Sequence, residues 1–461
     1  MKFRLLIQPK NIDWTIFCFL LFSHLPNAFY SIFLLFLVFA LRIAFSFKLS
    51  LPKSWKMIEF FWTLIGLIMM FSFFTHFSSF NNLFWGVICF LPIVLIPFLL
   101  PFRKYRYHQS SYRLINAVKL FTFVEIIVMI VQFVKLAFQF KTIDIFTATN
   151  GAAGDLITGT VGFSSVISVT LGYISIVFLN YYLNYKYKRD AIWFLISFIG
   201  MILPAYTAGT FVYVLSFVLF LLGRFIVDIF KSGIINKRTG ILIALLIVSI
   251  CIIVYSQMSN ILYAQRIISF VFFDPPNKIK AISSTFEYSK ENVWDIPLGV
   301  GFGNYSSRAA FITSGEYLAN QPKFIPVTRS KYFEKYMFPL FNKESQNKII
   351  SSSFGNSMIN APFNQFQTVY GEGGLISLSI LCILLAFVFK IKVPYSNNLH
   401  RLGLIYLILL MFCDNWLSYP SFCFIFWLLL LDIYTYVPMK QVRRVIIPFN
   451  MDRRVDSRYE Y

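Results

Sequence analysis

Long apolar segments recur along the whole chain, and they constrain its fold more than any other feature. Residues 57–77 and 365–389 are two examples, and each is long enough to cross the hydrocarbon core of a bilayer as a helix. Hydrophobic residues make up 58% of the 461 residues, and charged residues only 13%. A soluble domain could not bury so much apolar sequence. We therefore expect an all-α, polytopic integral membrane protein.

The apolar pattern predicts about twelve membrane-spanning helices. Their expected positions are 12–25, 27–47, 57–77, 83–102, 114–140, 165–183, 191–206, 209–230, 240–258, 365–389, 401–417 and 422–437. This divides the chain into spans 1–9 (1–258), a large polar loop (259–364), spans 10–12 (365–438) and a basic tail (439–461). Loops of such length are uncommon unless they have a function.

The distribution of positive charge predicts the orientation of these spans. Of the 41 Lys and Arg residues, 26 lie in alternate short connections, whereas the opposite set of short connections carries only Lys141. Positive residues concentrate on the cytoplasmic side of membrane proteins. Both termini are therefore expected in the cytoplasm, with the large loop between spans 9 and 10 on the external side.

The formal net charge of +21 does not indicate nucleic-acid binding, because most of it follows from this topology and faces anionic lipid headgroups. The external loop differs, since it carries 11 Lys and Arg against seven Asp and Glu on the side where topology requires no cations. An anionic ligand in the loop is the interpretation that this excess favours.

Few residues suit a metal or a redox centre. All six cysteines fall within predicted spans, the chain has only four histidines, and no acidic pair with metal-ligand spacing appears in the external segments. We therefore expect no metal, no cofactor and no disulfide framework.

Glu125 lies near the middle of the fifth predicted span. Such a residue is functional, or it is neutralised by protonation or paired with a neighbouring helix.

The external loop contains a glycine turn whose glycines alternate with larger residues. Glycines allow backbone N–H groups to approach an anion closely. No strand-turn-helix unit surrounds the turn, which excludes a dinucleotide-binding or P-loop motif. Two interpretations remain open, a simple turn and a substrate-binding loop. The residues of the second interpretation are Gly299, Gly301, Gly303, Asn304 and Tyr305.

The order of features around this turn resembles the bacterial O-antigen polymerase and ligase superfamily. Arg266 follows the ninth span, a polar helix-like segment covers 279–292, the glycine turn comes next, and the run N-A-P-F-N-Q-F-Q-T-V-Y-G-E-G-G-L (360–375) leads into the tenth span. The resemblance covers the twelve-span layout and about sixty positions in two blocks.

The chain departs from the family pattern at two places. Phe363 stands where the family usually has a histidine before Asn364, and the turn 207–210 lacks the arginine often found between spans 7 and 8. Ligases are thought to depend on that histidine. The resemblance therefore implies a polymerase of the bacterial inner membrane rather than a ligase. Such an enzyme makes O-antigen, capsule or exopolysaccharide, and a chain-length regulator and a flippase are possible membrane partners.

A polymerase of this family moves the growing glycan from one polyprenyl (undecaprenyl) diphosphate to the next lipid-linked repeat unit. The reaction requires a cation for the departing diphosphate, a base for the acceptor hydroxyl and aromatic platforms for sugars. Arg266 is the first candidate for the cation, because it follows the ninth span within ten residues. The further substrate-binding candidates are Lys280, Arg308, Arg329, Trp294 and Asn364.

The base remains open among several acids. Glu287, Glu291 and Asp295 lie in the loop, and Glu372 lies at the external mouth of the tenth span. Glu287 and Glu291 could also simply belong to the solvent-exposed face of a helix, and Glu372 could instead orient the loop.

A transporter or flippase for lipid-linked glycan is the alternative class of function. Short loops throughout, internal repeats and more polar groups in the spans would favour it, and the chain shows little of these beyond Glu125.

Overall fold

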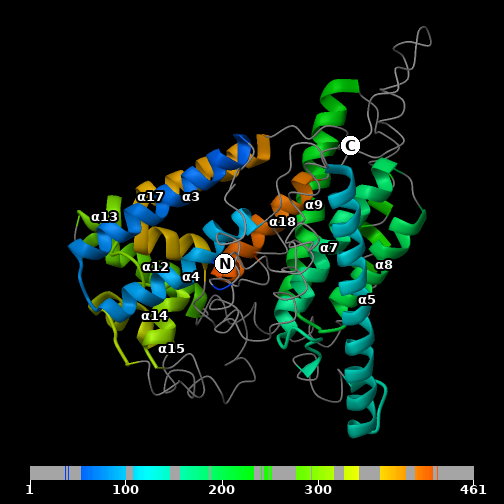
Figure 1. Cartoon of the computed structure of the whole chain (residues 1–461), viewed down its shortest axis with the longest axis horizontal. Coiled ribbons are helices and arrows are strands. Elements are labelled where there is room, and N and C mark those ends of the chain that lie inside the picture. Colours follow the sequence, from blue (N-terminus) through cyan, green and yellow to red (C-terminus); the bar gives the residue numbers. More distant parts are fainter. Residues whose placement is uncertain are drawn as a thin grey trace, which may run out of the picture.

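The computed structural model describes residues 53–99, 107–145, 156–185, 188–232, 277–291, 293–315, 326–341, 364–390 and 400–418, with isolated positions between 37 and 423. Within these residues every regular element is a helix, which confirms the predicted all-α class (Figure 1). The predicted spans 12–25, 27–47, 240–258 and 422–437 lie outside the described residues, apart from isolated positions. Arg266 and Phe363 also lie outside them.

Five described helices are long and apolar enough to cross a membrane, which supports the predicted membrane protein. They are Lys56–Thr75, Val118–Phe140, Ser164–Leu183, Ala208–Ile226 and Gln365–Lys390. Two shorter apolar helices, Phe80–Leu95 and His400–Cys413, fall near the predicted spans 83–102 and 401–417. The seventh predicted span, 191–206, corresponds to α8 (Lys188–Ile202), which has only 15 residues.

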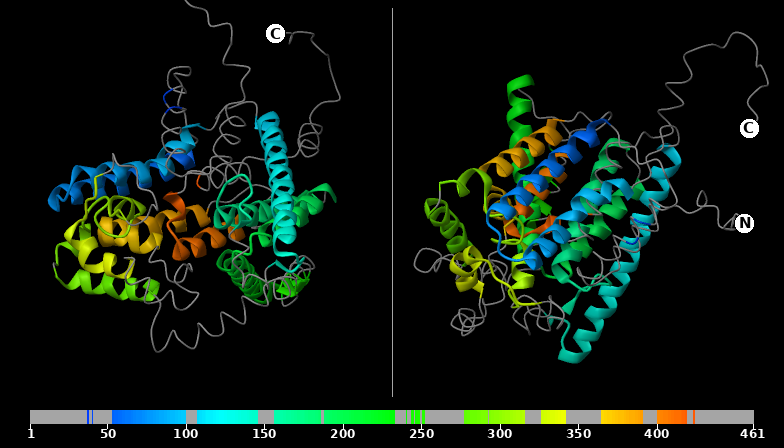
Figure 2. Two further views of the ribbon diagram at one scale, coloured as in Figure 1. Left: turned by 90° about the horizontal axis from the view of Figure 1, so that it is seen from below. Right: turned by 60° about the vertical axis from the view of Figure 1, so that its left-hand side comes forward.

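The helices form two groups. One contains α3 (Lys53–Thr75), α4 (Phe80–Leu99) and α17 (Gln365–Lys390), and the other contains α5 (Tyr107–Phe140), α7 (Ser164–Tyr185), α8 and α9 (Thr207–Ser232). Figure 1 shows α18 (His400–Cys413) between them, and the left view of Figure 2 shows the same division from below. α18 packs against α17 on one side and against α7 and α9 on the other.

α7 is the central helix of the second group, and 94% of its most apolar window is buried. Its apolar residues are spread around the whole helix rather than confined to one face, which is typical of a helix surrounded by protein. Its polar side chains bond inside the bundle, since Ser168 Oγ donates to Met201 O at 2.8 Å and Ser175 Oγ lies 2.9 Å from Tyr213 Oη. These bonds satisfy groups that would otherwise be costly to bury.

Glu125 binds a turn of the chain rather than standing alone in its span. Its carboxylate accepts hydrogen bonds from the Thr160 N–H, at 2.8 Å, and from the Thr160 hydroxyl. Two turns along α5, Gln132 Oε1 accepts from the N–H groups of Thr158 and Gly159 at 3.0 and 2.9 Å. Of the two interpretations of Glu125, these bonds favour pairing with a neighbouring segment.

The described parts of the polar loop form a folded unit with its own core. The helix predicted at 279–292 is present as α12 (Asn277–Glu291), and α13 (Asp295–Leu298), α14 (Arg308–Thr313), the π-helix η3 (Phe333–Met337) and α15 (Phe338–Phe341) follow. Buried aromatic side chains fill the space between α12, α14 and η3. They are Tyr288, Tyr305, Phe311, Tyr332, Phe333 and Tyr336.

Candidate functional site

The glycine turn lies wedged between α3, α4 and the start of α17. The N–H groups of Val300 and Gly301 donate to Gly371 O and Glu372 O at 3.0 and 2.9 Å, and Phe302 N–H donates to Met69 O at 3.3 Å. A Cβ on Gly301, whose φ is +85°, would lie 2.1 Å from Phe73 N. The described contacts therefore give the turn a packing role, and the N–H groups of Val300, Gly301 and Phe302 donate to backbone carbonyls.

Asn304 fixes the end of this turn to the α3–α4 connection. Its Nδ2 donates to Val300 O at 2.8 Å and to His76 O at 3.2 Å, and its Oδ1 accepts from the Ser78 hydroxyl. Tyr305 follows and is fully buried, with its hydroxyl donating to Thr285 Oγ1 at 3.0 Å. Both residues were predicted to bind substrate, and the structure places both inside the protein.

Glu372 connects the loop to α17. Its Oε1 accepts hydrogen bonds from the N–H groups of Tyr305 and Ser307 at 3.3 and 3.2 Å, and the side chain is buried. Gly374, two residues later, has φ +69° and kinks α17, so that the helix changes direction just after the carboxyl group. Glu372, the candidate base at the start of the tenth predicted span, is thus a buried acid at a helix kink.

Arg308 follows directly after Ser307 and is also buried. Its Nη2 lies 3.8 Å from Asp414 Oδ1, just beyond the end of α18. Lys278 Nζ donates to Cys413 O in the same corner. Burial lowers the pKa of Lys278, and the Asp414 carboxylate acts in the opposite direction. Two cations therefore surround one carboxylate where α12, α14 and α18 meet.

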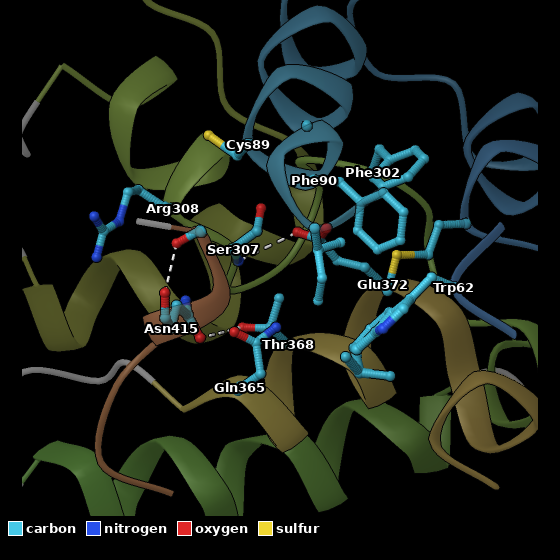
Figure 3. A pocket seen from close by; sticks show the side chains of 15 residues that line it. Trp62, Cys89, Phe90, Phe302, Ser307, Arg308, Gln365, Thr368, Glu372 and Asn415 are labelled. Carbon is cyan, nitrogen blue, oxygen red and sulfur yellow. Dashed lines mark hydrogen bonds between the residues drawn. The ribbon is translucent and has the colours of Figure 1, made fainter. Parts of the chain in front are cut away.

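Arg308 and Glu372 line one pocket, which contains about 480 Å³ of empty space, part of it open to the outside. Figure 3 shows the Arg308 guanidinium on one side of Ser307 and the Glu372 carboxyl on the other. Apolar side chains from α3, α4 and the glycine turn form one wall, and polar side chains from α17 and the segment after α18 form another. The apolar wall includes Trp62, Phe90 and Phe302, and the polar wall includes Gln365, Thr368 and Asn415.

The polar wall is bonded to the loop. Thr368 Oγ1 lies 3.0 Å from Ser306 O and 3.1 Å from Asn415 Oδ1, and Asn415 Nδ2 donates to Ser306 O at 3.2 Å. In contrast, Trp62 Nε1 and Gln365 Oε1 are buried without a hydrogen-bond partner within the described structure. Buried polar atoms of this kind are uncommon in folded proteins. One donor and one acceptor on the pocket wall therefore remain available to a ligand.

The other predicted site residues lie away from this pocket. Glu287 is exposed on α12, Lys280 is half-buried there, and Trp294 is largely exposed. Arg329 lies over the Phe338 ring, with Cζ 3.8 Å from its centroid. The remaining two predicted residues are placed by their helices: Glu291 is the last residue of α12, and Asn364 Oδ1 accepts from the N–H groups of the residues that begin α17.

Asp295, one of several candidate bases, is buried and lies close to a histidine. His76 Nε2 lies 2.7 Å from Asp295 Oδ1, and the Tyr332 hydroxyl donates to Asp295 Oδ2 at 3.0 Å. His76 follows the end of α3, so this contact joins α3 to the loop core. Sequence reasoning missed the pair because 219 positions separate the two residues and no local motif connects them.

Neither a known protein family, nor a characterised protein, nor a solved structure matches the chain. Among the residues that the structure describes, no three His, Cys, Asp or Glu side chains are grouped as metal ligands. The chemistry of the site must therefore be argued from the pocket and its two buried charged residues.

Proposed function

We propose that the protein is a membrane glycosyltransferase that polymerises a lipid-linked surface polysaccharide at the external face of the bacterial cytoplasmic membrane. The observation that carries the proposal is the shared pocket of Arg308 and Glu372, in which a buried cation and a buried acid lie on either side of Ser307. The apolar wall of the pocket suits a substrate with a hydrocarbon part, and the polar wall suits one with sugar hydroxyl groups.

In the proposed reaction, a hydroxyl of the acceptor repeat unit attacks the anomeric carbon of the growing chain. A new glycosidic C–O bond forms, and the bond between that carbon and the phosphate oxygen breaks. Glu372 takes the proton of the acceptor hydroxyl, and the electron pair leaves with the polyprenyl diphosphate. Arg308 stabilises the departing diphosphate, because a guanidinium binds phosphate oxygens through two parallel hydrogen bonds and stays charged. Arg266, outside the described residues, remains a second candidate for this role.

The proposed topology agrees with the contacts of the loop. The described loop segments pack against His76 just after α3, against Asn82 in the first turn of α4, against the start of α17 and against the end of α18. The distribution of Lys and Arg assigns all these ends to the external side. A reporter fused after Arg453 should therefore be cytoplasmic and one inserted near Gly315 external. Finding both on one side would contradict the twelve-span topology.

Deletion of the gene tests the function directly. A polymerase mutant should make surface glycan with single repeat units, seen on a gel as one short product. Complete loss of surface glycan would indicate an exporter instead, and polymerised chains that are not attached to their final acceptor would indicate a ligase.

Variants of Arg308 test the assignment of the pocket. Arg308→Ala should slow chain extension by about a hundredfold or more, as for loss of one preorganised charge-stabilising donor. Arg308→Lys should recover only part of the rate, because an ammonium cannot form the two-pronged contact. The rate is measured per folded protein in detergent with a defined lipid-linked repeat unit. A near wild-type rate for Arg308→Ala would exclude this pocket as the site.

A further inference from the structure

α12 presents an apolar face that no described part of the protein covers. Ala281 and Tyr288 point into the loop core, whereas Ile279, Ile282 and Phe286 lie on the opposite side with exposed fractions of 44, 38 and 65%. The spacing of three and four residues places these three side chains on one stripe of the helix. A water-facing helix would normally carry polar residues in this stripe, so a partner is expected there.

The residues just after α12 extend this apolar surface. Val293 is 73% exposed and Trp294 is 77% exposed. Trp294 was predicted to bind substrate, but it lines no part of the described pocket. Tryptophan is enriched where membrane and water meet, because its ring is apolar and its N–H is polar.

Two contacts of α12 and one of the segment after it indicate where this helix lies. Near its start, Lys278 Nζ donates to Cys413 O at the end of α18. One turn later, Ala281 O accepts from Gln367 Nε2 near the start of α17, at 3.2 Å. Just beyond its end, Asp295 contacts His76 at the end of α3. A 15-residue helix is about 22 Å long. α12 therefore lies beside the ends of α17 and α18, and the segment just after it reaches the residue that follows α3. If these helices span a membrane, α12 lies near the ends at which they leave it.

The adjoining end of α3 is itself apolar on the outside. Phe71, Phe74 and Phe77 are each more than half exposed, so they contact hydrocarbon or its boundary if α3 spans the membrane. Lys290 is exposed beside the apolar stripe of α12, where an ammonium can reach phosphate headgroups. We propose that Ile279, Ile282 and Phe286, with Val293 and Trp294, bind the lipid surface at the boundary between headgroups and acyl chains.

This lipid contact would fix the loop core at a set height above the membrane, and with it Arg308 and Glu372. The proposal does not depend on the polymerase function, because it concerns only the lipid surface. A second copy of the chain and another membrane protein are the competing occupants of the same face.

Photo-cross-linking in intact membranes distinguishes these occupants. The full chain is made with p-benzoylphenylalanine in place of Phe286, in cells whose phospholipids carry radioactive phosphate, and is purified after irradiation. Position 286 tolerates the analogue because its side chain is mostly exposed, and Ile282 serves as a second position on the same stripe. Glu287, exposed but turned about 100° away around the helix, is the matched control.

We expect phospholipid attached to the protein from positions 286 and 282, and at least severalfold less from position 287. Cross-linking of position 286 to a second copy or to another protein would overturn the proposal. Equal lipid labelling at all three positions, or none at 286 and 282, would overturn it as well.

Discussion

Glu372 can be tested by separating its charge from its hydrogen bonds. Its Oε1 accepts the N–H groups of Tyr305 and Ser307, and a glutamine oxygen at the same place accepts both, with weaker bonds than a carboxylate forms. Glu372→Gln should therefore leave the free energy of unfolding within about 2 kcal/mol of wild type. Glutamine cannot take a proton from the acceptor hydroxyl. Chain extension should fall by about 10²- to 10⁴-fold, the usual contribution of a general base.

Glu372→Ala provides the structural comparison. It leaves at least two buried N–H groups, those of Tyr305 and Ser307, without an acceptor, which costs about 1–3 kcal/mol for each group. This variant should lower both the thermal stability of the detergent-solubilised protein and the rate. Stability is followed by the loss of a monodisperse gel-filtration peak on heating, and rate by chain extension per folded protein. A Glu372→Gln variant that extends chains at a near wild-type rate would refute the proton-transfer role and leave Glu372 as a residue that only holds the loop.

Three further predictions follow from other parts of the structure. Gly301→Ala should destabilise the protein by at least about 2 kcal/mol, because φ is +85° and a Cβ would meet the Phe73 backbone at 2.1 Å. The control is Gly223→Ala in a helix, which should be neutral or stabilising because nothing lies within 4 Å of its Cβ. Equal shifts in the thermal stability of the two variants would contradict this prediction. Burial lowers the pKa of Lys278 from its ordinary 10.5, so the protonated form is disfavoured in the folded state. Wild type should therefore gain thermal stability relative to Lys278→Met as the pH rises towards 10.5. A loss of stability relative to the variant would contradict this prediction. Chain extension should survive EDTA, whereas activity that is lost and then restored by Mg²⁺ or Mn²⁺ would reveal a metal site.

The sequence predicted local structure better than it predicted the site. Hydropathy located the segments that became α3 and α17, and the polar segment 279–292 is helical as expected. Such features depend on residues close together in the chain, where periodicity is informative. Hydropathy overestimated the length of α8, because the apolar run continues past Ile202 into a turn. The backbone of this turn includes Ala205 at φ +51°.

The contacts that build the site were out of reach for the opposite reason. The spacing of glycines in the turn indicated close backbone approach but not what would approach, and the structure shows the α3 backbone and the kink of α17 in that place. Asn415 and Thr368 lie 47 positions apart and carry no shared motif, yet their side chains meet at 3.1 Å. Long-range pairing of this kind depends on how whole helices pack, which one sequence does not encode in any local pattern.

The site belongs to the assembled chain rather than to the loop. Arg308 comes from the loop, Glu372 from the first turns of α17 and Asp414 from the end of α18. An isolated loop would retain the guanidinium and lose both carboxylates. Docking of the loop onto the helix ends therefore creates the pocket and, at the same time, removes its charges from bulk water, where their interactions with a phosphate would be much weaker. Any change that loosens this docking should reduce activity even when every charged side chain is still present.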